Sequence, residues 1–167
     1  MNMQMVIDDW KANAERHYKD NFRFLRSLKM QDDRPVDRAA QRMHEEAFSI
    51  IDCLQCANCC RAVSPIFRKS DIRRIAERLG MKVVDFMATY LEADEHGDLL
   101  LKTLPCAFLG VDNRCMIYEV RPRDCTEYPH TQKKGFSSRT HSHTANTIDC
   151  PAVFYVVEQL HAQKRQR

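Results

Sequence analysis

The sequence predicts an α-rich α+β fold, with a small, irregular, metal-centred cysteine module that contains a short β-hairpin and is braced by N- and C-terminal helices. Three observations support this. All eight cysteines lie between residues 53 and 150, apolar residues recur at helical spacing before and after them, and 167 residues suit one domain with a helical extension. We therefore divide the chain into a helical hairpin extension (1–52), a cysteine module (53–151) and a C-terminal helix that packs on the module (152–167).

Bulk composition excludes several classes of protein. The formal net charge is only +3, which is too small to indicate nucleic acid or an anionic membrane as a partner. No apolar run approaches the roughly 20 residues that a membrane-spanning helix needs. Asp8 and Asp9 stand where a signal peptide would be apolar, so we expect a cytoplasmic protein whose thiols stay reduced.

Two helices are expected before the first cysteine. The first covers about residues 8–28, and the second is entered through Pro35. Residues 31–35 separate the two helices, which predicts a hairpin. The apolar positions of the second helix fall on one face: Val36, Ala39, Ala40, Met43, Ala47, Ile50 and Ile51.

Shorter elements follow the cysteine run. Ser70 is expected to cap a helix over residues 71–79 that ends at Gly80, and another helix covers about residues 83–91. The β-hairpin is predicted from residues 107–109 and 116–118, joined by a turn.

The end of the chain is expected to contain a loop and a helix. Residues 131–147 are polar with only scattered apolar positions, which predicts a long surface loop. Pro151 suits the first turn of the last helix. Its buried stripe is expected to contain Val153, Val156, Val157 and Leu160.

Four thiols crowd into eight residues at the start of the module. Two-residue gaps let the chain curl so that consecutive sulfurs face one centre, while nearby amide N–H groups donate to sulfur. Packing does not require this spacing, and four disulfides would need an oxidising compartment. The later cysteines lie at the ends of short predicted elements. We therefore predict eight metal ligands: Cys53, Cys56, Cys59, Cys60, Cys106, Cys115, Cys125 and Cys150.

The cysteine pattern leaves the metal and the number of sites open. Paired Cys-x-x-Cys knuckles are typical of zinc, whereas three cysteines at two-residue gaps are typical of iron–sulfur ligation. Cys59 and Cys60 are adjacent, and adjacent side chains diverge in extended backbone, so one site or two would fit. An iron–sulfur cluster and zinc are thus alternative cofactors. Three histidines in polar sequence are weaker ligand candidates, namely His130, His141 and His143.

Three classes of function follow from this pattern. The favoured one is a metal-binding protein whose site is structural, sensory or a carrier. A redox or group-transfer enzyme that uses the cluster is the second. The third is a zinc-stabilised interaction module that docks a protein partner through its N-terminal helices. No glycine-rich phosphate loop or nucleophile elbow in the sequence indicates a particular reaction, so the sequence does not decide whether the protein is an enzyme.

Several motifs occur in the order that is seen in a known family. They are Cys-x-x-Cys-x-x-Cys-Cys-Arg61, Ser70-Asp-Ile72, Pro105-Cys106-Ala-Phe-Leu109, Arg114-Cys-Met-Ile-Tyr118, Arg121-Pro122, Tyr128-Pro129 and Cys150-Pro151. Over residues 53–151 the chain resembles the YkgJ-type cysteine-cluster family of zinc- or iron-chelating domains. The resemblance implies metal binding without a defined substrate, and similar clusters in flagellin lysine N-methylases keep the enzyme alternative open. Ala57 and Asn58 stand where the family often has a glycine, and Thr126 stands where it often has an arginine.

Serine replacement of Cys53 or Cys56 is expected to abolish metal loading and to lower solubility. The reason is that a serine oxygen replaces a thiolate poorly, and a small metal module depends on its metal for stability. Metal analysis and thermal melting of the purified variants check this. Normal metal content and normal melting in either variant would contradict the ligand assignment.

Overall fold

The computed structural model describes residues 1–165, which form two compact units. The helical unit comprises Met1–Asp52 and the chain from Pro129 onward, and the cysteine unit comprises Cys53–Tyr128. The cysteine unit begins at the residue where the sequence places the module, whereas residues 129–151 group with the helices. Gln166 and Arg167, at the end of the predicted segment 152–167, lie outside the described residues.

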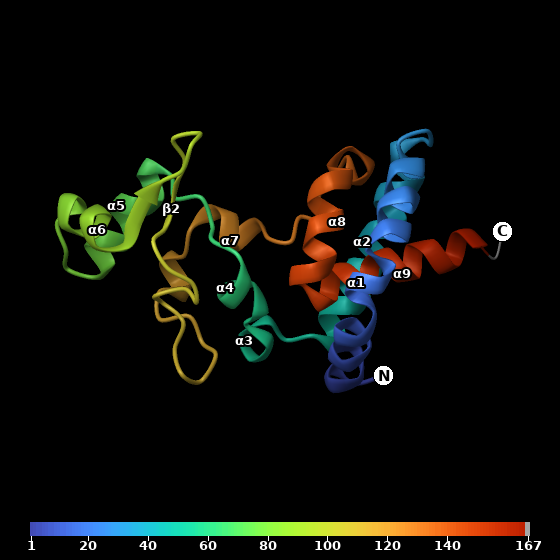
Figure 1. The fold of residues 1–167 in the computed structure, drawn as a ribbon, viewed down its shortest axis with the longest axis horizontal. Helices are drawn as coiled ribbons and strands as arrows, with labels where there is room; N and C mark the ends of the chain where they lie inside the picture. Colours follow the sequence, from blue (N-terminus) through green and yellow to red (C-terminus); the bar gives the residue numbers. More distant parts are fainter. Residues whose placement is uncertain (166–167) are drawn as a thin grey trace. The chain divides into compact units, whose positions relative to one another are not determined.

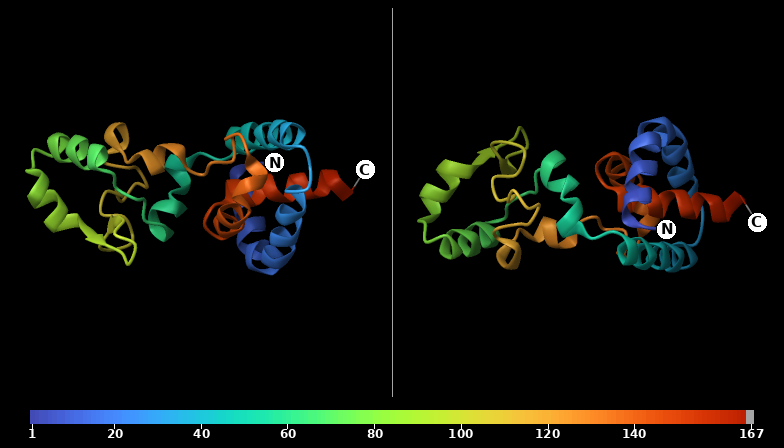
Figure 2. Two further views of the ribbon diagram at one scale, coloured as in Figure 1. Left: turned by 90° about the horizontal axis from the view of Figure 1, so that it is seen from above. Right: turned by 90° about the horizontal axis from the view of Figure 1, so that it is seen from below.

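The last helix is the central element of the helical unit. This unit contains α1 (Met3–Leu28), α2 (Asp33–Ile50), the 3-10 turn η2 (Phe136–Arg139), α8 (Thr140–Asp149) and α9 (Pro151–Arg165). α9 packs against α1, α2 and α8, and Figures 1 and 2 show it crossing this group of helices. All residues from 151 to 157 are buried, so this part of α9 is covered on every side, whereas the sequence predicts a one-sided stripe.

α1 and α2 direct their apolar faces mainly at the C-terminal helices. Trp10 of α1 packs with Ala14 and with Phe154 of α9. The indole N–H of Trp10 donates to the Thr147 carbonyl of α8 at 2.8 Å. Four of the predicted apolar positions of α2 are buried, namely Val36, Ala40, Met43 and Ala47. These apolar faces of the N-terminal helices, through which a protein partner was predicted to dock, are thus covered within the helical unit.

The segment predicted as a surface loop, residues 131–147, forms η2 and most of α8 instead. Thr144 and Thr147 donate their hydroxyl groups to the carbonyls of Thr140 and Thr144, each at 2.7 Å. Hydroxyls that are satisfied in this way can be buried, so a polar sequence forms an inward-facing helix. Asp37 of α2 accepts two backbone N–H groups ahead of and at the start of η2, at 2.9 and 2.8 Å, and thereby anchors the segment.

The cysteine unit is built from short elements that are joined by irregular chain. They are α3 (Cys53–Cys56), α4 (Asn58–Ala62), α5 (Lys69–Arg78), α6 (Val83–Tyr90), β1 (Leu91–Ala93), β2 (Leu99–Leu101), η1 (Tyr118–Val120) and α7 (Arg123–Glu127). β1 and β2 pair antiparallel, with Leu91 opposite Leu101. Helices at both ends of the chain and a short hairpin confirm the predicted α-rich α+β class.

The hairpin lies earlier in the chain than predicted. Asp94 closes its turn by accepting two backbone N–H groups, each at 2.9 Å, and Gly97 takes the left-handed φ of 82°. The segments predicted to pair, residues 107–109 and 116–118, are joined by the Met116 N–H, which donates to the Phe108 carbonyl at 2.9 Å, beside an isolated bridge between Leu109 and Cys115, but they are not strands. Strands of three residues are too short to show period-two alternation, which is why the sequence pattern does not locate β1 and β2.

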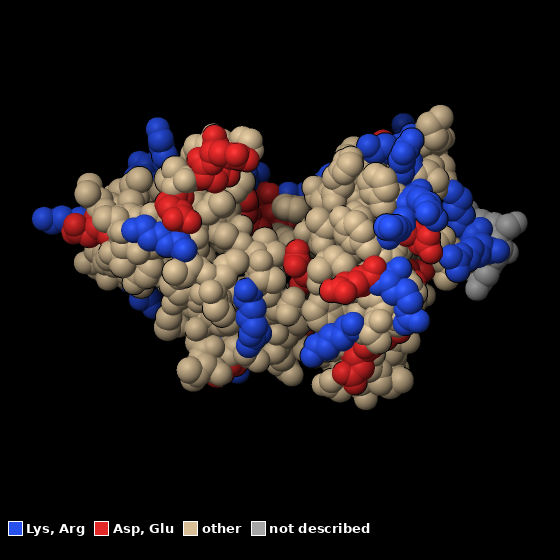
Figure 3. Space-filling model, viewed as in Figure 1, with Lys and Arg blue, Asp and Glu red and all other residues tan. Residues whose placement is uncertain are grey.

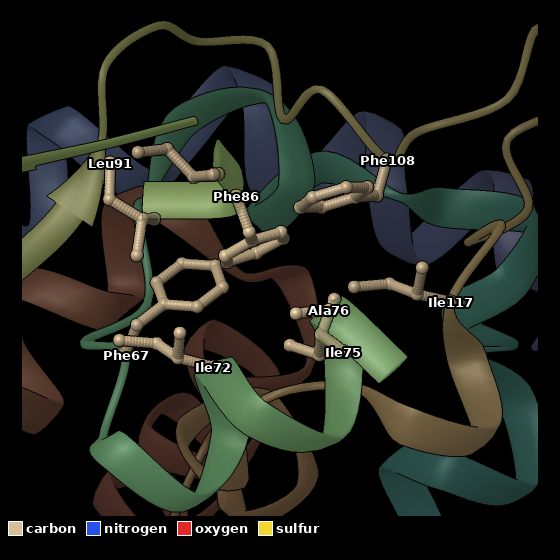
Figure 4. Close-up of a cluster of buried hydrophobic side chains, with 9 residues drawn as sticks. Phe67, Ile72, Ile75, Ala76, Phe86, Leu91, Phe108 and Ile117 are labelled. Carbon is tan, nitrogen blue, oxygen red and sulfur yellow. The ribbon is translucent and has the colours of Figure 1, made fainter. Parts of the chain in front are cut away.

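Phe86 occupies the centre of the apolar core of the cysteine unit (Figure 4). Its fully buried ring lies between Phe67 and Phe108, with centroid separations of 6.3 and 6.2 Å. The other buried members are Ile72, Ile75, Ala76, Leu91, Leu101 and Ile117. Cys106 and Cys115 pack against this cluster, so the apolar core helps to position two of the cysteines.

The surface carries charges of both signs. On the face shown in Figure 3, basic and acidic side chains both occur over each unit. Of the helices within residues 1–165, none combines the length and the apolar composition that crossing a bilayer requires.

His143 of α8 is a fully buried titratable side chain. Its ring stacks on Phe136 with centroids 4.2 Å apart, and neither ring nitrogen has a hydrogen-bond partner among the described residues. Burial lowers the pKa of His143 to about 3, and the positive charges of Arg139 and His130 contribute to the shift. An unfolded chain would bind this proton at the ordinary histidine pKa of about 6.5, so folding requires the neutral ring at mildly acidic pH.

Acid is therefore expected to destabilise the helical unit. Above pH ~6.5 the ring is neutral in both the folded and the unfolded chain. Below that pH the unfolded chain binds the proton, so the free energy of unfolding declines by up to about 1.4 kcal/mol per pH unit as the pH falls toward the folded pKa. His143→Leu should make this decline shallower, and His96→Gln at an exposed histidine is the control. Trp10, the single tryptophan, reports denaturant unfolding of this unit by fluorescence. Equal acid slopes for His143→Leu and the unmodified chain would contradict the expectation.

Candidate metal centre

A left-handed residue divides the cysteine run into two short helices. Buried Ala57 has φ 50° and separates α3, which carries Cys53 and Cys56, from α4, which carries Cys59 and Cys60. Residues with a Cβ adopt this conformation at a cost of roughly 1–2 kcal/mol. The backbone therefore turns between the second and third cysteines at the position where the resembled family often has a glycine.

Backbone contacts bring Cys60, Cys106 and Cys115 near one another. The Cys106 N–H donates to the Cys60 carbonyl at 2.8 Å, which joins α4 to the turn at residues 105–106. The chain then doubles back, and Cys115 forms the isolated bridge with Leu109. Three cysteines that are distant in sequence are thus held in one region of the cysteine unit.

Two carboxylates position α7 and its cysteine, Cys125. Asp71 is only 1% exposed, and it accepts the Arg123 N–H at 3.2 Å and a guanidinium N–H of Arg74 at 2.8 Å. Asp124 accepts a backbone N–H, at 3.3 Å, from the chain ahead of α5. These hydrogen bonds join α7 both to α5 and to the chain ahead of α5. Cys125 is thereby held in place without a regular sheet or a long helix.

Asp71 also explains why the start of α5 differs from the prediction. The sequence predicts Ser70 as the N-cap, whereas the N-cap is Arg68, whose N–H donates to Asp71 at 3.1 Å. An acidic side chain that reaches back to the cap N–H forms half of a capping box. The role of Asp71 is not evident from the sequence, because arginine is an uncommon N-cap and nearby Ser70 is a favoured one.

The thiol pKa values of this region shift in opposite directions. A hydrogen bond with Cys59 lowers the pKa of Cys60 to about 7, with burial opposing the shift and the charge of Arg61 supporting it. Burial raises the pKa of Cys106 to about 11 and that of Cys125 to about 12, although Cys125 as a whole residue is exposed. Burial raises the pKa of Cys115 as well.

Charges on neighbouring cysteines raise these pKa values further. Every pair within one group of four cysteines interacts electrostatically. We call this group the four-thiol set, and it consists of Cys60, Cys106, Cys115 and Cys125. Thiolates that are partly desolvated and repel one another would be stabilised by a bound cation.

The donor chemistry of the four-thiol set fits a zinc or iron ion. Thiolate sulfur is a soft ligand that both metals accept. The Phe108 N–H donates to the Cys106 sulfur at 3.4 Å, and the Ile117 N–H donates to the Cys115 sulfur. Donation to a ligand atom of this kind orients it and tunes its charge. In the described part of the chain, no three Cys, His, Asp or Glu side chains are already disposed as metal ligands.

The other four predicted ligands are not members of the four-thiol set. Cys53 and Cys56 lie on α3, Cys59 lies beside Cys60 on α4, and buried Cys150 lies between α8 and α9 in the helical unit. Within residues 1–165, no cysteine forms a disulfide. Metal ligation by these four remains a prediction.

The three candidate histidines all lie in the helical unit. His143 is buried in stacking contact with Phe136, and His141 packs its ring on Phe22 with centroids 5.4 Å apart. His130 has a left-handed φ of 66°. The histidines are therefore not part of the cysteine unit that holds the four-thiol set.

A protein-family model matches residues 52–148, and its family, CxxCxxCC, is described as a "putative zinc- or iron-chelating domain". The match covers more than half of the chain and includes the whole four-thiol set. This chain belongs to the CxxCxxCC family. CxxCxxCC membership confirms the resemblance seen in the sequence and supports metal binding, while the family description names both zinc and iron. No curated protein and no solved structure matches the chain.

Asp71→Asn is expected to lower the free energy of unfolding of the cysteine unit by about 1.5–3 kcal/mol. Buried hydrogen bonds to a charged group are lost, and an amide N–H of the new side chain would face the Arg68 N–H. Glu77→Gln, on the exposed side of the same helix, is the control. Denaturant unfolding followed by circular dichroism measures both, and equal stability of the two variants would contradict the role of Asp71.

Proposed function

We propose that the cysteine unit binds zinc or iron, as a single ion or as an iron–sulfur cluster, through the thiolates of Cys60, Cys106, Cys115 and Cys125. The observations that carry the proposal are that Cys106 and Cys115 pack against one apolar core, that the Cys106 N–H donates to the Cys60 carbonyl, and that the charges of all four thiols act on one another. Four thiolates complete a tetrahedral zinc or iron site and equally a four-iron cluster. Membership of the CxxCxxCC family supports the class of ligand.

Contacts that do not involve sulfur support the proposed site. Cys106 and Cys115 pack against the apolar core around Phe86, and Asp71 and Asp124 anchor the helix that carries Cys125. A bound metal ion would supply positive charge that offsets the negative charges of the neighbouring thiolates. Because a hydrogen bond and apolar contacts already hold the segments of Cys60, Cys106 and Cys115, folding meets part of the entropic cost of bringing these ligands together.

Serine substitution at each cysteine, one at a time in the full-length protein, tests the ligand assignment. The variants at the four-thiol set are expected to lose bound metal, because three thiolates cannot complete the site. Metal-to-protein ratios after purification without air measure this. Full metal content in both Cys106→Ser and Cys125→Ser would contradict the proposal.

The same set of variants tests the prediction for the remaining cysteines. If Cys53, Cys56, Cys59 and Cys150 ligate a second metal, their serine variants lose that second equivalent and keep the first. If there is instead a single site that includes Cys53 and Cys56, their serine variants lose all bound metal, as the sequence predicts. Unchanged metal content in all four would restrict binding to the four-thiol set.

The identity of the metal follows from the unmodified protein. Colour with acid-labile sulfide would identify an iron–sulfur cluster, iron without sulfide would identify a mononuclear iron site, and colourless protein with stoichiometric zinc would identify a zinc site. Protein without stoichiometric zinc or iron would contradict the proposed function as a whole.

A further inference from the structure

Two side chains, exposed Arg61 and half-buried Asn113, fasten the cysteine run to the loop between Cys106 and Cys115. Arg61 donates through Nη1 to the Cys56 carbonyl at 3.1 Å and through Nη2 to Asn113 Oδ1. Asn113 in turn donates through Nδ2 to a second carbonyl at the end of α3, that of Gln55, at 3.0 Å. We call this pair, Arg61 and Asn113, the Arg–Asn clasp.

The backbone places both members of the clasp. The carbonyls of Gln55 and Cys56 lie at the C-terminal end of α3, where helix carbonyls need partners from outside the helix and favour a cation. Asn113 has φ 69°, a left-handed conformation that asparagine tolerates better than most residues. Its N–H donates to the Gly110 carbonyl at 3.1 Å, which closes the turn and directs the amide toward α3.

The clasp joins the two parts of the chain that supply most of the four-thiol set. Arg61 directly follows Cys60 on α4, and Asn113 lies two residues before Cys115. The backbone bond from Cys106 to Cys60 joins the same two segments at another point. Together these contacts fix the loop relative to the cysteine run at more than one place.

We propose that the Arg–Asn clasp sets the metal affinity of the four-thiol set by holding the loop of Cys106 and Cys115 against the cysteine run. Arg61 and Asn113 are positioning residues, since neither supplies a ligand atom. The inference rests on the proposed function, and it adds two residues outside the thiols to the determinants of binding. Loss of contacts that orient ligands typically weakens metal binding about 10–100-fold.

The test must separate geometry from charge, because Arg61 also places a positive charge near Cys60. Arg61→Lys keeps the charge but lacks the planar fork that reaches two acceptors, and Arg61→Gln removes both. Asn113→Gly removes the amide while retaining the left-handed backbone. Arg114→Gln is the matched control, because exposed Arg114 lies in the same loop and its ion pair is with Asp112, 3.9 Å away.

Each full-length variant is titrated with Zn²⁺ in competition with a chromophoric chelator, and with Co²⁺ to record the ligand-field spectrum of the site. Arg61→Gln, Arg61→Lys and Asn113→Gly are expected to bind Zn²⁺ about 10–100-fold more weakly and to alter the Co²⁺ spectrum. Combining Arg61→Gln with Asn113→Gly should weaken binding by less than the product of the single effects, because both break the same clasp. Arg114→Gln should match the unmodified protein.

Three results would overturn the inference. Unchanged affinity in both Arg61→Gln and Asn113→Gly would show that the clasp does not act on the site. Full affinity in Arg61→Lys with loss in Arg61→Gln would show that charge alone acts. If the unmodified protein carries neither zinc nor iron after purification without air and also binds neither Zn²⁺ nor Co²⁺, the proposed function itself fails, and this outcome is distinct from metal binding that the clasp variants leave unchanged. Far-UV circular dichroism of the metal-free variants confirms that each is folded.

Discussion

The cysteine unit is governed by an electrostatic conflict among thiols that lie close together and partly out of water. Desolvation and the charge of neighbouring thiolates raise the pKa of Cys106, Cys115 and Cys125, so proximity makes each sulfur harder to ionise. If these sulfurs were all ionised without a cation between them, they would repel one another. The apolar core, the buried carboxylate of Asp71 and the Arg–Asn clasp hold the segments that carry them. The conflict is the physical reason for considering a cation at this place.

In this unit, hydrogen bonds from polar side chains to the backbone hold the chain in position, as long helices and sheets do in larger domains. The chain from residue 102 to residue 128 has few ladder hydrogen bonds, yet the carboxylates of Asp71 and Asp124 fix its later part and the Asn113 amide fixes its loop. Each anchor is a side chain that bonds to backbone, so it specifies position without requiring regular structure. Such anchoring leaves cysteine side chains at the ends of short elements, where they can face one another.

Sequence patterns predicted the features that depend on residues close together in the chain, such as helices and helix ends. Helical periodicity located α2 and α6, and the left-handed φ of Gly80 follows the end of α5 as expected. Residues 131–147 were predicted wrongly as a surface loop because their composition is polar. The threonine hydroxyls in α8 donate to carbonyls of the same helix, which allows them to be buried. Sequence spacing treats Cys60 as the end of a run, whereas its backbone bond to Cys106 places it with distant cysteines. No local pattern encodes that pairing, nor the contact of Arg61 with Asn113.

The central position of α9 has a consequence for how the chain is made. The polypeptide leaves the helical unit after Asp52 and returns to it at Pro129, and α9 is the element against which α1, α2 and α8 all pack. On the ribosome, α1 and α2 emerge first, and their apolar faces stay uncovered while the intervening cysteine unit is translated. That unit is contiguous in sequence and has its own core, so it can fold during this interval. A nascent chain stalled before α9 would therefore present Trp10 and its neighbours to chaperones while the cysteine unit is already folded.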